Sequence, residues 1–308
     1  MLRAVLDRSA EAAVPPESMF LLDFAPVRRR GGLEKPEAAA AFVRTVWSHP
    51  RVRLWKLGGD PPLVPPGLGH ADAYRFAVEA PFRAYARAAG KERFGDKTPA
   101  YLHAVDELLA VWPEGRVVVL VRDARDVALS IRAMPFGPNN AYAAARWWAR
   151  GIRRGLDAQR RHPEQVLTVR YEDLVLDPPA RIEQVCAHLG LGYNSEMLAI
   201  EGSERTDDET ARYSRVTAGI TAAEVGKWRT GMSREDQRIV AAVAGPELRE
   251  LGYEAEAGGS SVGGVTALGY SAHDAARRAA NLVRLRVVEE RGRELRYVVR
   301  RKLGRLGT

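Results

Sequence analysis

The chain has 308 residues, of which 46% are hydrophobic and 28% are charged, which is typical of a soluble globular protein with a sizeable core. No apolar run approaches the roughly 20 residues that cross a bilayer, and the N-terminus lacks the apolar segment of a secretory signal. We therefore expect a cytoplasmic protein. The single cysteine, Cys186, excludes an intramolecular disulfide, and the six histidines lack the spacing of metal ligands, so no metal site is expected.

The net charge of +8 is concentrated at the C-terminus. From Ser271 onward there are eleven Lys and Arg residues against four Asp and Glu residues, a balance of +7. The rest of the chain is therefore close to neutral. A nucleic-acid partner is not expected for the body of the protein, because its basic character belongs to the tail.

Helical patterns dominate the first part of the chain. Four helices are predicted, over residues 2–13, 36–48, 71–90 and 99–112. Pro15 and Pro16 are expected to end the first of them. A loop rich in Pro and Gly is predicted at residues 58–69.

The clearest strand signal is the β-branched run at residues 116–121, RVVVLV, which predicts a strand buried on both faces. Helices at 123–132 and 141–160 separate it from a second predicted strand at 166–169. The helix 180–189 follows. A strand, a helix and a strand at this spacing form a parallel crossover, so the predicted fold class is α/β with a parallel sheet.

The C-terminal part predicts a separate module. Residues 254–270, with AGGSSVGG at 257–264, are expected to be a flexible linker, and residues 271–308 a basic amphipathic helix. The apolar stripe of that helix would contain Leu282, Leu285, Val288, Leu295, Val299, Leu303 and Leu306. It could pack on the body of the protein, on a second copy in a homodimer, or on an anionic membrane surface.

The unit VVVLVRDARDVALS carries the most specific chemical signal. Arg122 comes just after a buried strand, where open parallel sheets bind ligands, and Ser130 lies eight residues later in the following helix. Together they could hold a phosphate. The alternative is an arginine paired with Asp123 or Asp126 and a serine on the helix surface.

Four further pieces occur in a characteristic order: PPES at 15–18, GDKTP at 95–99, VRYEDLVLDP at 169–178, and GKW at 226–228 followed by GY at 252–253. With RDARDVALS, they resemble sulfotransferases that use 3′-phosphoadenosine 5′-phosphosulfate (PAPS). The similarity is greatest to bacterial members related to tyrosylprotein and heparan sulfate sulfotransferases. It covers about residues 1–253, which would form the sulfotransferase domain. It implies a three-layer fold like that of P-loop NTPases, with a central parallel sheet and PAPS as co-substrate.

The resemblance also implies residue roles at the nucleotide. Arg122 and Ser130 match the family's pair that grips the 3′-phosphate of PAPS. Tyr171 matches a tyrosine near the adenine, and Lys227 a lysine near the nucleotide. The alternatives are a core position for Tyr171 and a surface cation packed on Trp228 for Lys227.

At the reacting end, Lys97 matches a lysine near the sulfonate and its bridging oxygen. Glu17 matches the glutamate that acts as catalytic base in the tyrosylprotein branch. Other members carry a histidine base two residues after the lysine, where this chain has Pro99. A base and a cation suit sulfuryl transfer, which depends on positioning and on stabilising the leaving oxygen and requires no metal. The alternative for Glu17 and Lys97 is an exposed position in a solvated loop.

The sequence departs from the family pattern at its N-terminus. In the family, a strand and a PxSGTT-type loop for the 5′-phosphosulfate precede a helix that residues 1–7 already resemble. That strand and loop would lie before Met1, and Gly226-Lys227 does not complete a P-loop motif. One hypothesis is a start upstream of Met1. The other is a truncated, catalytically inactive homologue that acts as a nucleotide-binding or interaction protein.

The basic tail and the acceptor each allow more than one hypothesis. An adaptor that binds nucleic acid or a membrane through the basic tail is a third hypothesis, supported by that tail alone. The acceptor of the sulfonate could be a carbohydrate, a lipid head group, a peptide tyrosine or a small metabolite. Phe136, Trp147 and Trp148 could line an acceptor cleft or belong to the core.

Overall fold

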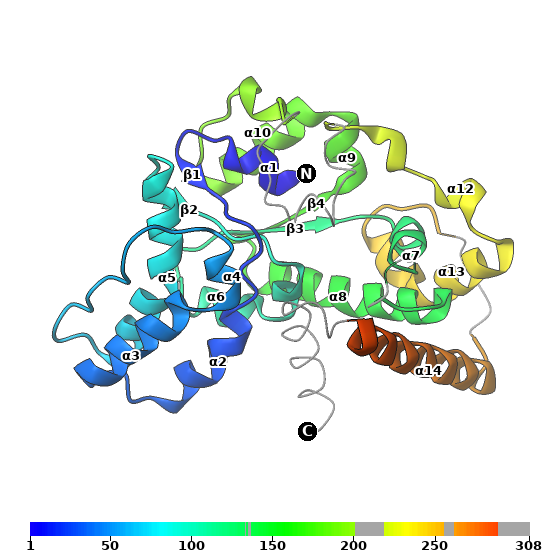
Figure 1. The fold of residues 1–308 in the computed structure, drawn as a ribbon. Helices are drawn as coiled ribbons and strands as arrows, with labels where there is room; N and C mark the ends of the chain where they lie inside the picture. The colour runs from blue at the N-terminus through cyan, green and yellow to red at the C-terminus, as the bar shows by residue number, and fades with distance from the viewer. Residues whose placement is uncertain (133, 135–136, 201–218, 256–261, 289–308) are drawn as a thin grey trace. The chain divides into compact units, whose positions relative to one another are not determined.

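The computed structural model describes residues 1–308 except 133, 135–136, 201–218, 256–261 and 289–308, and describes the backbone alone for 282–288. It has a mixed α/β architecture with parallel sheets, as the sequence predicts (Figure 1). None of the helices in the described ranges is long and apolar enough to cross a membrane.

The chain divides into two compact units, each built from separate stretches of sequence. Unit 1 comprises Met1–Val119, Ala158–Val169 and Asp173–Ala222. Unit 2 comprises Leu120–Asp157, Arg170–Glu172 and Ala223–Thr308. The chain therefore passes from one unit to the other within strands and helices, at positions 119–120, 157–158, 169–170, 172–173 and 222–223.

Unit 1 is mainly helical around an aromatic core. Its elements include α1 (Leu2–Asp7), α2 (Leu21–Arg30), α3 (Pro36–Trp47), α4 (Pro50–Arg53), α5 (His70–Ala88), η1 (Pro99–His103), α6 (Val105–Leu109), α10 (Pro178–Leu189) and η2 (Ser195–Leu198). Phe20, Trp55 and Phe82 pack with ring centroids 5.0–6.2 Å apart. Burying three large rings together gives this unit a well-defined core.

Two of the predicted helices differ from the structure. The prediction of a helix over 2–13 is wrong beyond Asp7, because Ala12–Ala13 form strand β1, which pairs in parallel with β2 (Arg93–Phe94). Asp7, the last residue of α1, accepts the Val14 N–H at 2.8 Å through its carboxylate, which holds the segment after the helix. The helix expected over 99–112 is broken at Ala104, whose φ of −141° is not helical.

The two longer strands form where they are predicted. β3 (Val117–Val121) and β4 (Val166–Arg170) are neighbours in a two-stranded sheet, and the Val117 N–H donates to Gln165 O at 2.7 Å. The expectation that β3 is buried on both faces is wrong at Leu120, which is 38% exposed while Val121 is buried. Successive side chains of a strand face opposite ways, so one face of β3 is better covered than the other.

The predicted crossover helices are also present. α7 (Ala124–Arg132) follows β3, α8 (Ala141–Arg161) leads toward β4, and α9 (Tyr171–Leu176) begins directly after β4. The chain therefore carries its most specific motifs at the points where β3 and β4 end.

The last part of the chain contains η4 (Ala222–Glu224), α12 (Trp228–Gly231), α13 (Arg234–Glu250) and α14 (Gly264–Val288). α14 begins at Gly264, inside the segment expected to be a linker. Its first half packs within unit 2, where the Tyr270 ring stacks on Tyr142 and the Asn139 N–H donates to Asp274. The predicted apolar stripe, from Leu282 onward, lies outside the described side chains.

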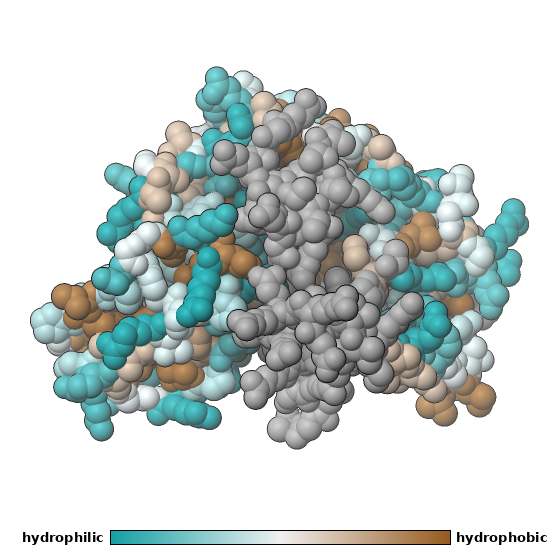
Figure 2. All heavy atoms as spheres, in the orientation of Figure 1, coloured by the Kyte–Doolittle hydropathy of each residue, from teal (hydrophilic) through white to brown (hydrophobic). Residues whose placement is uncertain are grey.

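The drawn face of the molecule carries hydrophilic and hydrophobic residues interspersed (Figure 2). Several large apolar side chains are exposed, namely Leu63, Trp147, Leu176, Val265 and Leu268. Single exposed apolar residues of this kind are normal for a protein surface and by themselves indicate no binding site.

Candidate active site

Arg122 lies where β3 ends, and Tyr171 where the neighbouring β4 ends. The Arg122 guanidinium is 5.2 Å from the centroid of the Tyr171 ring, donates to the carbonyl of Glu224, and is 3.7 Å from the Asp126 carboxylate. Burial raises the pKa of Tyr171, and the positive charge of Arg122 opposes that rise. The structure thus brings together two residues that the sequence placed in different motifs.

Arg122 retains unused hydrogen-bonding capacity. Its Nε is buried and has no hydrogen-bond partner within the described ranges. Its backbone is fixed by Trp148, whose Nε1 donates to the Arg122 carbonyl at 2.8 Å. The Arg122 side chain as a whole is 22% exposed, so its guanidinium can still meet an anionic group from a ligand, such as a phosphate.

Asp126 holds the GKW segment in place. Its side chain is fully buried and accepts the N–H groups of Gly226 at 2.8 Å and of Trp228 at 2.9 Å. Gly226 has φ 72°, a left-handed conformation that favours glycine. The structure therefore contains the ion pair between Arg122 and Asp126 that the sequence allowed as an alternative. Asp126 also shapes the turn that carries Lys227.

Two more buried acids link the remaining motifs. Arg125 donates to both carboxylate oxygens of Asp123, and the guanidinium of Arg125 lies 3.6 Å from the centroid of the Trp228 ring. Glu172 accepts the Asp123 N–H at 2.9 Å and the Tyr253 hydroxyl at 2.6 Å. These contacts join the RDARD, YED, GKW and GY sequences of unit 2 into what we term the motif cluster.

Sequence reasoning identified the arginine and the tyrosine of the motif cluster but did not assign Asp123, Asp126 and Glu172 their anchoring roles. The positions of these acidic residues could have indicated that role. Acidic residues directly after buried strands must find hydrogen-bond donors, because a buried carboxylate without partners is very unfavourable. Such residues are candidates for anchoring a loop as well as for binding a ligand.

The other two predicted nucleotide residues form no hydrogen bond with Arg122 within the described ranges, although Arg122 and Lys227 both contact Glu224. Lys227 forms an ion pair with Glu224 and is half-exposed. Ser130 is on α7 and partly buried, and in the described part of the chain it makes no hydrogen bond to Arg122. The structure therefore brings Arg122 and Tyr171 into contact but does not join Ser130 to them.

Replacing Asp126 by Ala is expected to lower the free energy of unfolding by about 2–4 kcal/mol, because two backbone donors and Arg122 lose a buried partner. Urea-induced unfolding measures the effect. Asp60→Ala is a suitable control, since Asp60 is exposed in a loop. A variant as stable as the control would contradict the anchoring role of Asp126.

The candidate catalytic residues meet in unit 1. Glu17 and Lys97, 80 positions apart in sequence, form a direct ion pair in which their side chains are 20% and 41% exposed. Glu17 follows β1, and Lys97 follows β2. Because these strands are parallel, the segments after them leave from the same edge of the sheet. The two residues predicted from separate motifs therefore belong to one local site.

Neighbouring residues fix the two loops. Ser18 donates a hydrogen bond to the Asp96 carboxylate, and Trp55 Nε1 donates to the Pro16 carbonyl at 3.0 Å. Sequence reasoning quoted the motifs that contain Ser18 and Asp96 but assigned neither residue a role. Their positions beside Glu17 and Lys97 make them part of the same arrangement.

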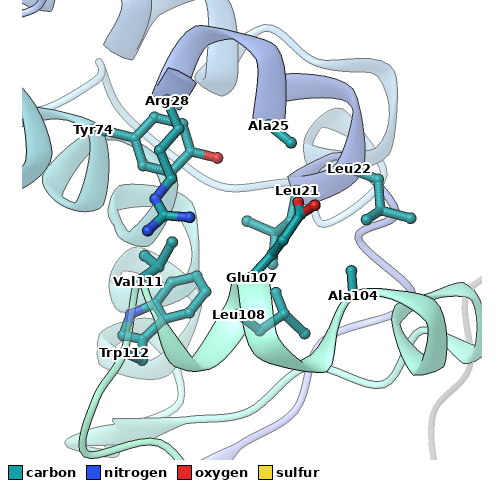
Figure 3. A pocket seen from close by; sticks show the side chains of 10 residues that line it. All are labelled: Leu21, Leu22, Ala25, Arg28, Tyr74, Ala104, Glu107, Leu108, Val111 and Trp112. Atoms are coloured by element: carbon teal, nitrogen blue, oxygen red, sulfur yellow. The ribbon is translucent and has the colours of Figure 1, made fainter. Parts of the chain in front are cut away.

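A small pocket of unit 1 lies elsewhere, between α2, α5 and the α6 region (Figure 3). Its lining residues are Leu21, Leu22, Ala25, Arg28, Tyr74, Ala104, Glu107, Leu108, Val111 and Trp112. Neither Glu17 nor Lys97 belongs to this set. The described residues include no group of three or more His, Cys, Asp or Glu arranged to hold a metal ion.

The aromatic residues considered for an acceptor cleft separate into different environments. Trp148 is buried and its indole holds the Arg122 backbone, whereas Trp147 is 46% exposed. Phe136 lies outside the described residues. Trp148 thus has a structural role, and Trp147 is accessible for contact.

Comparison with known proteins decides the family. A sequence model described as the Sulfotransferase family matches residues 1–195. The chain belongs to this family. The resemblance that the motifs indicate is thereby confirmed.

Two similar protein sequences agree with this placement. Nodulation protein NoeE of Sinorhizobium fredii is 29% identical over 218 residues, which are 58% of this chain and 49% of that protein. A putative protein-tyrosine sulfotransferase of Caenorhabditis briggsae is 28% identical over 171 residues, or 53% of this chain and 61% of that protein. The chain therefore spans about half to three-fifths of the length of these relatives.

Solved structures agree with the fold. A sulfotransferase domain from the curacin biosynthetic pathway has a TM-score of 0.50 at 20% identity, covering 83% of this chain and 93% of that one. One from the Synechococcus PCC 7002 olefin synthase has a TM-score of 0.51 at 19% identity, covering 83% and 90%. At these identities the similarity concerns the fold alone, and it supports the P-loop-like class that the resemblance implies.

Proposed function

We propose that this chain transfers a sulfonate group from PAPS to an acceptor hydroxyl. The observation that carries the proposal is the ion pair between Glu17 and Lys97 in a member of the sulfotransferase family. A carboxylate and an ammonium group held together supply a proton acceptor and a stabilising cation, which are the two groups that sulfuryl transfer needs.

In the proposed reaction, PAPS supplies an activated sulfonate on a phosphate leaving group. Glu17 takes the proton of the acceptor hydroxyl as its oxygen forms a bond to sulfur in line with the bond that breaks. Lys97 stabilises the negative charge that develops on the departing bridge oxygen. No metal is needed, since the cation and the carboxylate belong to the chain itself.

The motif cluster is the proposed site for the nucleotide. Arg122 would bind the 3′-phosphate through its partly exposed guanidinium, with Ser130 as the second group of the predicted pair. Tyr171 would lie near the adenine, and Lys227 would approach the nucleotide from the turn that Asp126 holds. The buried anchors of this cluster favour a rigid site, and rigidity limits the entropy lost on binding.

The proposed acceptor is a hydroxylated compound: a carbohydrate, a lipid head group, a peptide tyrosine or a small metabolite. We also propose that residues 1–253 are the sulfotransferase domain. The segment 254–270 would connect it to a basic C-terminal helix. That helix would contact a second copy in a homodimer or bind to a membrane surface. The contacts of Tyr270 and Asp274 described above support docking of the first part of that helix on unit 2.

The test is to incubate the full chain with PAPS and a panel of these four acceptor classes, and to measure the nucleotide product PAP together with sulfated acceptor by mass spectrometry. Equal amounts of both products are expected for at least one class. PAP binding without any sulfated product would favour the alternative of an inactive nucleotide-binding homologue. Absence of both would contradict the proposed function.

A further inference from the structure

A hydrogen-bond network ties the loop after β1 to the loop after β2, one residue away from Glu17 and Lys97. Ser18 Oγ donates to Asp96 Oδ2, and Tyr101 Oη lies 2.7 Å from Ser18 Oγ. The Leu21 N–H donates to Tyr101 Oη at 3.1 Å. Because Ser18 is completely buried, its hydroxyl depends on these protein partners.

The direction of the network follows from the number of protons available. Each hydroxyl has one proton to donate. Ser18 gives its proton to Asp96, so Tyr101 must be the donor to Ser18. Thr98 Oγ1 donates to the other oxygen of Asp96 at 3.3 Å. The donors therefore lead to the Asp96 carboxylate, whose ionised form accepts one hydrogen bond on each oxygen. A proton on Oδ2 would occupy the position to which Ser18 donates and would reverse that hydrogen bond.

The network also holds an unusual backbone conformation. Met19, next to Ser18, has φ 57°, in the left-handed region that residues other than glycine seldom adopt. Its N–H donates to Thr98 Oγ1 at 3.4 Å. Such a conformation persists when surrounding contacts fix it, so loosening the network would let the loop that carries Glu17 relax.

We propose that Asp96 is a positioning residue that holds Glu17 beside Lys97 only while its own carboxyl group is ionised. This inference rests on the proposed function for its effect on catalysis. The groups that face Asp96 are the hydroxyls of Ser18, Thr98 and Tyr101 and the carboxylate of Glu17, and Lys97 is its neighbour in sequence.

The pH at which the network changes is accessible to experiment. Burial raises the pKa of Asp96 to about 6, although hydrogen bonds from Ser18 and Thr98 oppose the rise, and the negative charge of Glu17 adds to it. Protonation below this pH removes the acceptor at the end of the network. Sulfonate transfer is therefore expected to decline on the acidic side of pH 6.

Asp96→Asn is the principal test, made in the full chain. The expected result is a fall in kcat of about 10–100-fold with a KM for PAPS within about twofold of wild type, because positioning and not nucleotide binding is affected. The acidic limb of the kcat profile near pH 6 should disappear, since Asn does not titrate. Asp60→Asn, in an exposed loop, is the matched control and should keep both kcat and the limb.

A second measurement does not depend on activity. Because the folded-state pKa of Asp96 is raised from its ordinary value of 3.8 to about 6, the group favours folding at low pH, and this contribution is lost as pH rises from about 4 to 6. Wild type should therefore lose unfolding free energy over this range relative to Asp96→Asn, as measured by urea unfolding at each pH.

The outcomes separate the two proposals. Retention of wild-type kcat and of the acidic limb in Asp96→Asn would overturn the positioning role. If the full chain transfers no sulfonate, the proposed function fails, and the stability curves alone decide the network. If the unfolding free energies of wild type and Asp96→Asn change in parallel between pH 4 and 6, the ionisation-dependent role of Asp96 is overturned.

Discussion

Glu17→Gln is expected to lower kcat about 10²–10⁴-fold, the range associated with loss of a general base. The amide keeps the size of the side chain and can still accept a hydrogen bond from Lys97, but it cannot take a proton from the acceptor. Because the ion pair is partly exposed, its loss should change folding stability little. Once an acceptor that gives a sulfated product has been identified, steady-state kinetics at saturating PAPS measure the effect.

The same variant should bind PAP as tightly as wild type, since the base acts on the acceptor and not on the nucleotide. Glu92→Gln is the matched control: Glu92 is exposed in unit 1 and close in sequence to Lys97, and its replacement should leave kcat unchanged. Near-native turnover of Glu17→Gln would assign the base role to another residue.

Arg122→Ala is expected to weaken PAP binding by about 2–4 kcal/mol, or roughly 30–1000-fold in Kd, if the charge pair with the 3′-phosphate is desolvated. Binding of adenosine 5′-phosphosulfate, which lacks the 3′-phosphate, should change far less. Isothermal titration calorimetry with both ligands measures the difference. The comparison within one variant removes any general loosening of the motif cluster.

Arg132→Ala provides the control for Arg122, because Arg132 lies on α7 and forms an ion pair with Asp236 at 2.7 Å. It should leave both affinities unchanged. Arg122→Lys retains the charge but not the planar fork and should give an intermediate loss. An equal loss for PAP and for adenosine 5′-phosphosulfate in Arg122→Ala would contradict the 3′-phosphate role.

Much of the fold could be predicted from local patterns. The strands β3 and β4 and the helices α7, α8 and α10 form within a few residues of their predicted bounds, because their apolar periodicity agrees with the way they pack. β1 could not be predicted, since Ala12 and Ala13 favour a helix and become a strand only by pairing with Arg93 and Phe94.

The candidate site was predictable in part. The sequence nominated Glu17 and Lys97, but their contact depends on the pairing of β1 with β2, which no local pattern reveals. The roles of Asp96 and Asp126 escaped prediction for a related reason. A buried carboxylate is recognised by the donors around it, and those donors come from residues about 80–100 positions away in sequence.

The most direct test of the proposed nucleotide site is the affinity of the full chain for PAP relative to adenosine 5′-monophosphate, which lacks only the 3′-phosphate. Both affinities are measured by calorimetry under the same conditions. If Arg122 and its surroundings recognise that phosphate, PAP should bind at least about tenfold more tightly, a difference of about 1.4 kcal/mol. Equal affinities, or no binding of either nucleotide, would contradict the assignment of the motif cluster as the nucleotide site of a PAPS-dependent sulfotransferase.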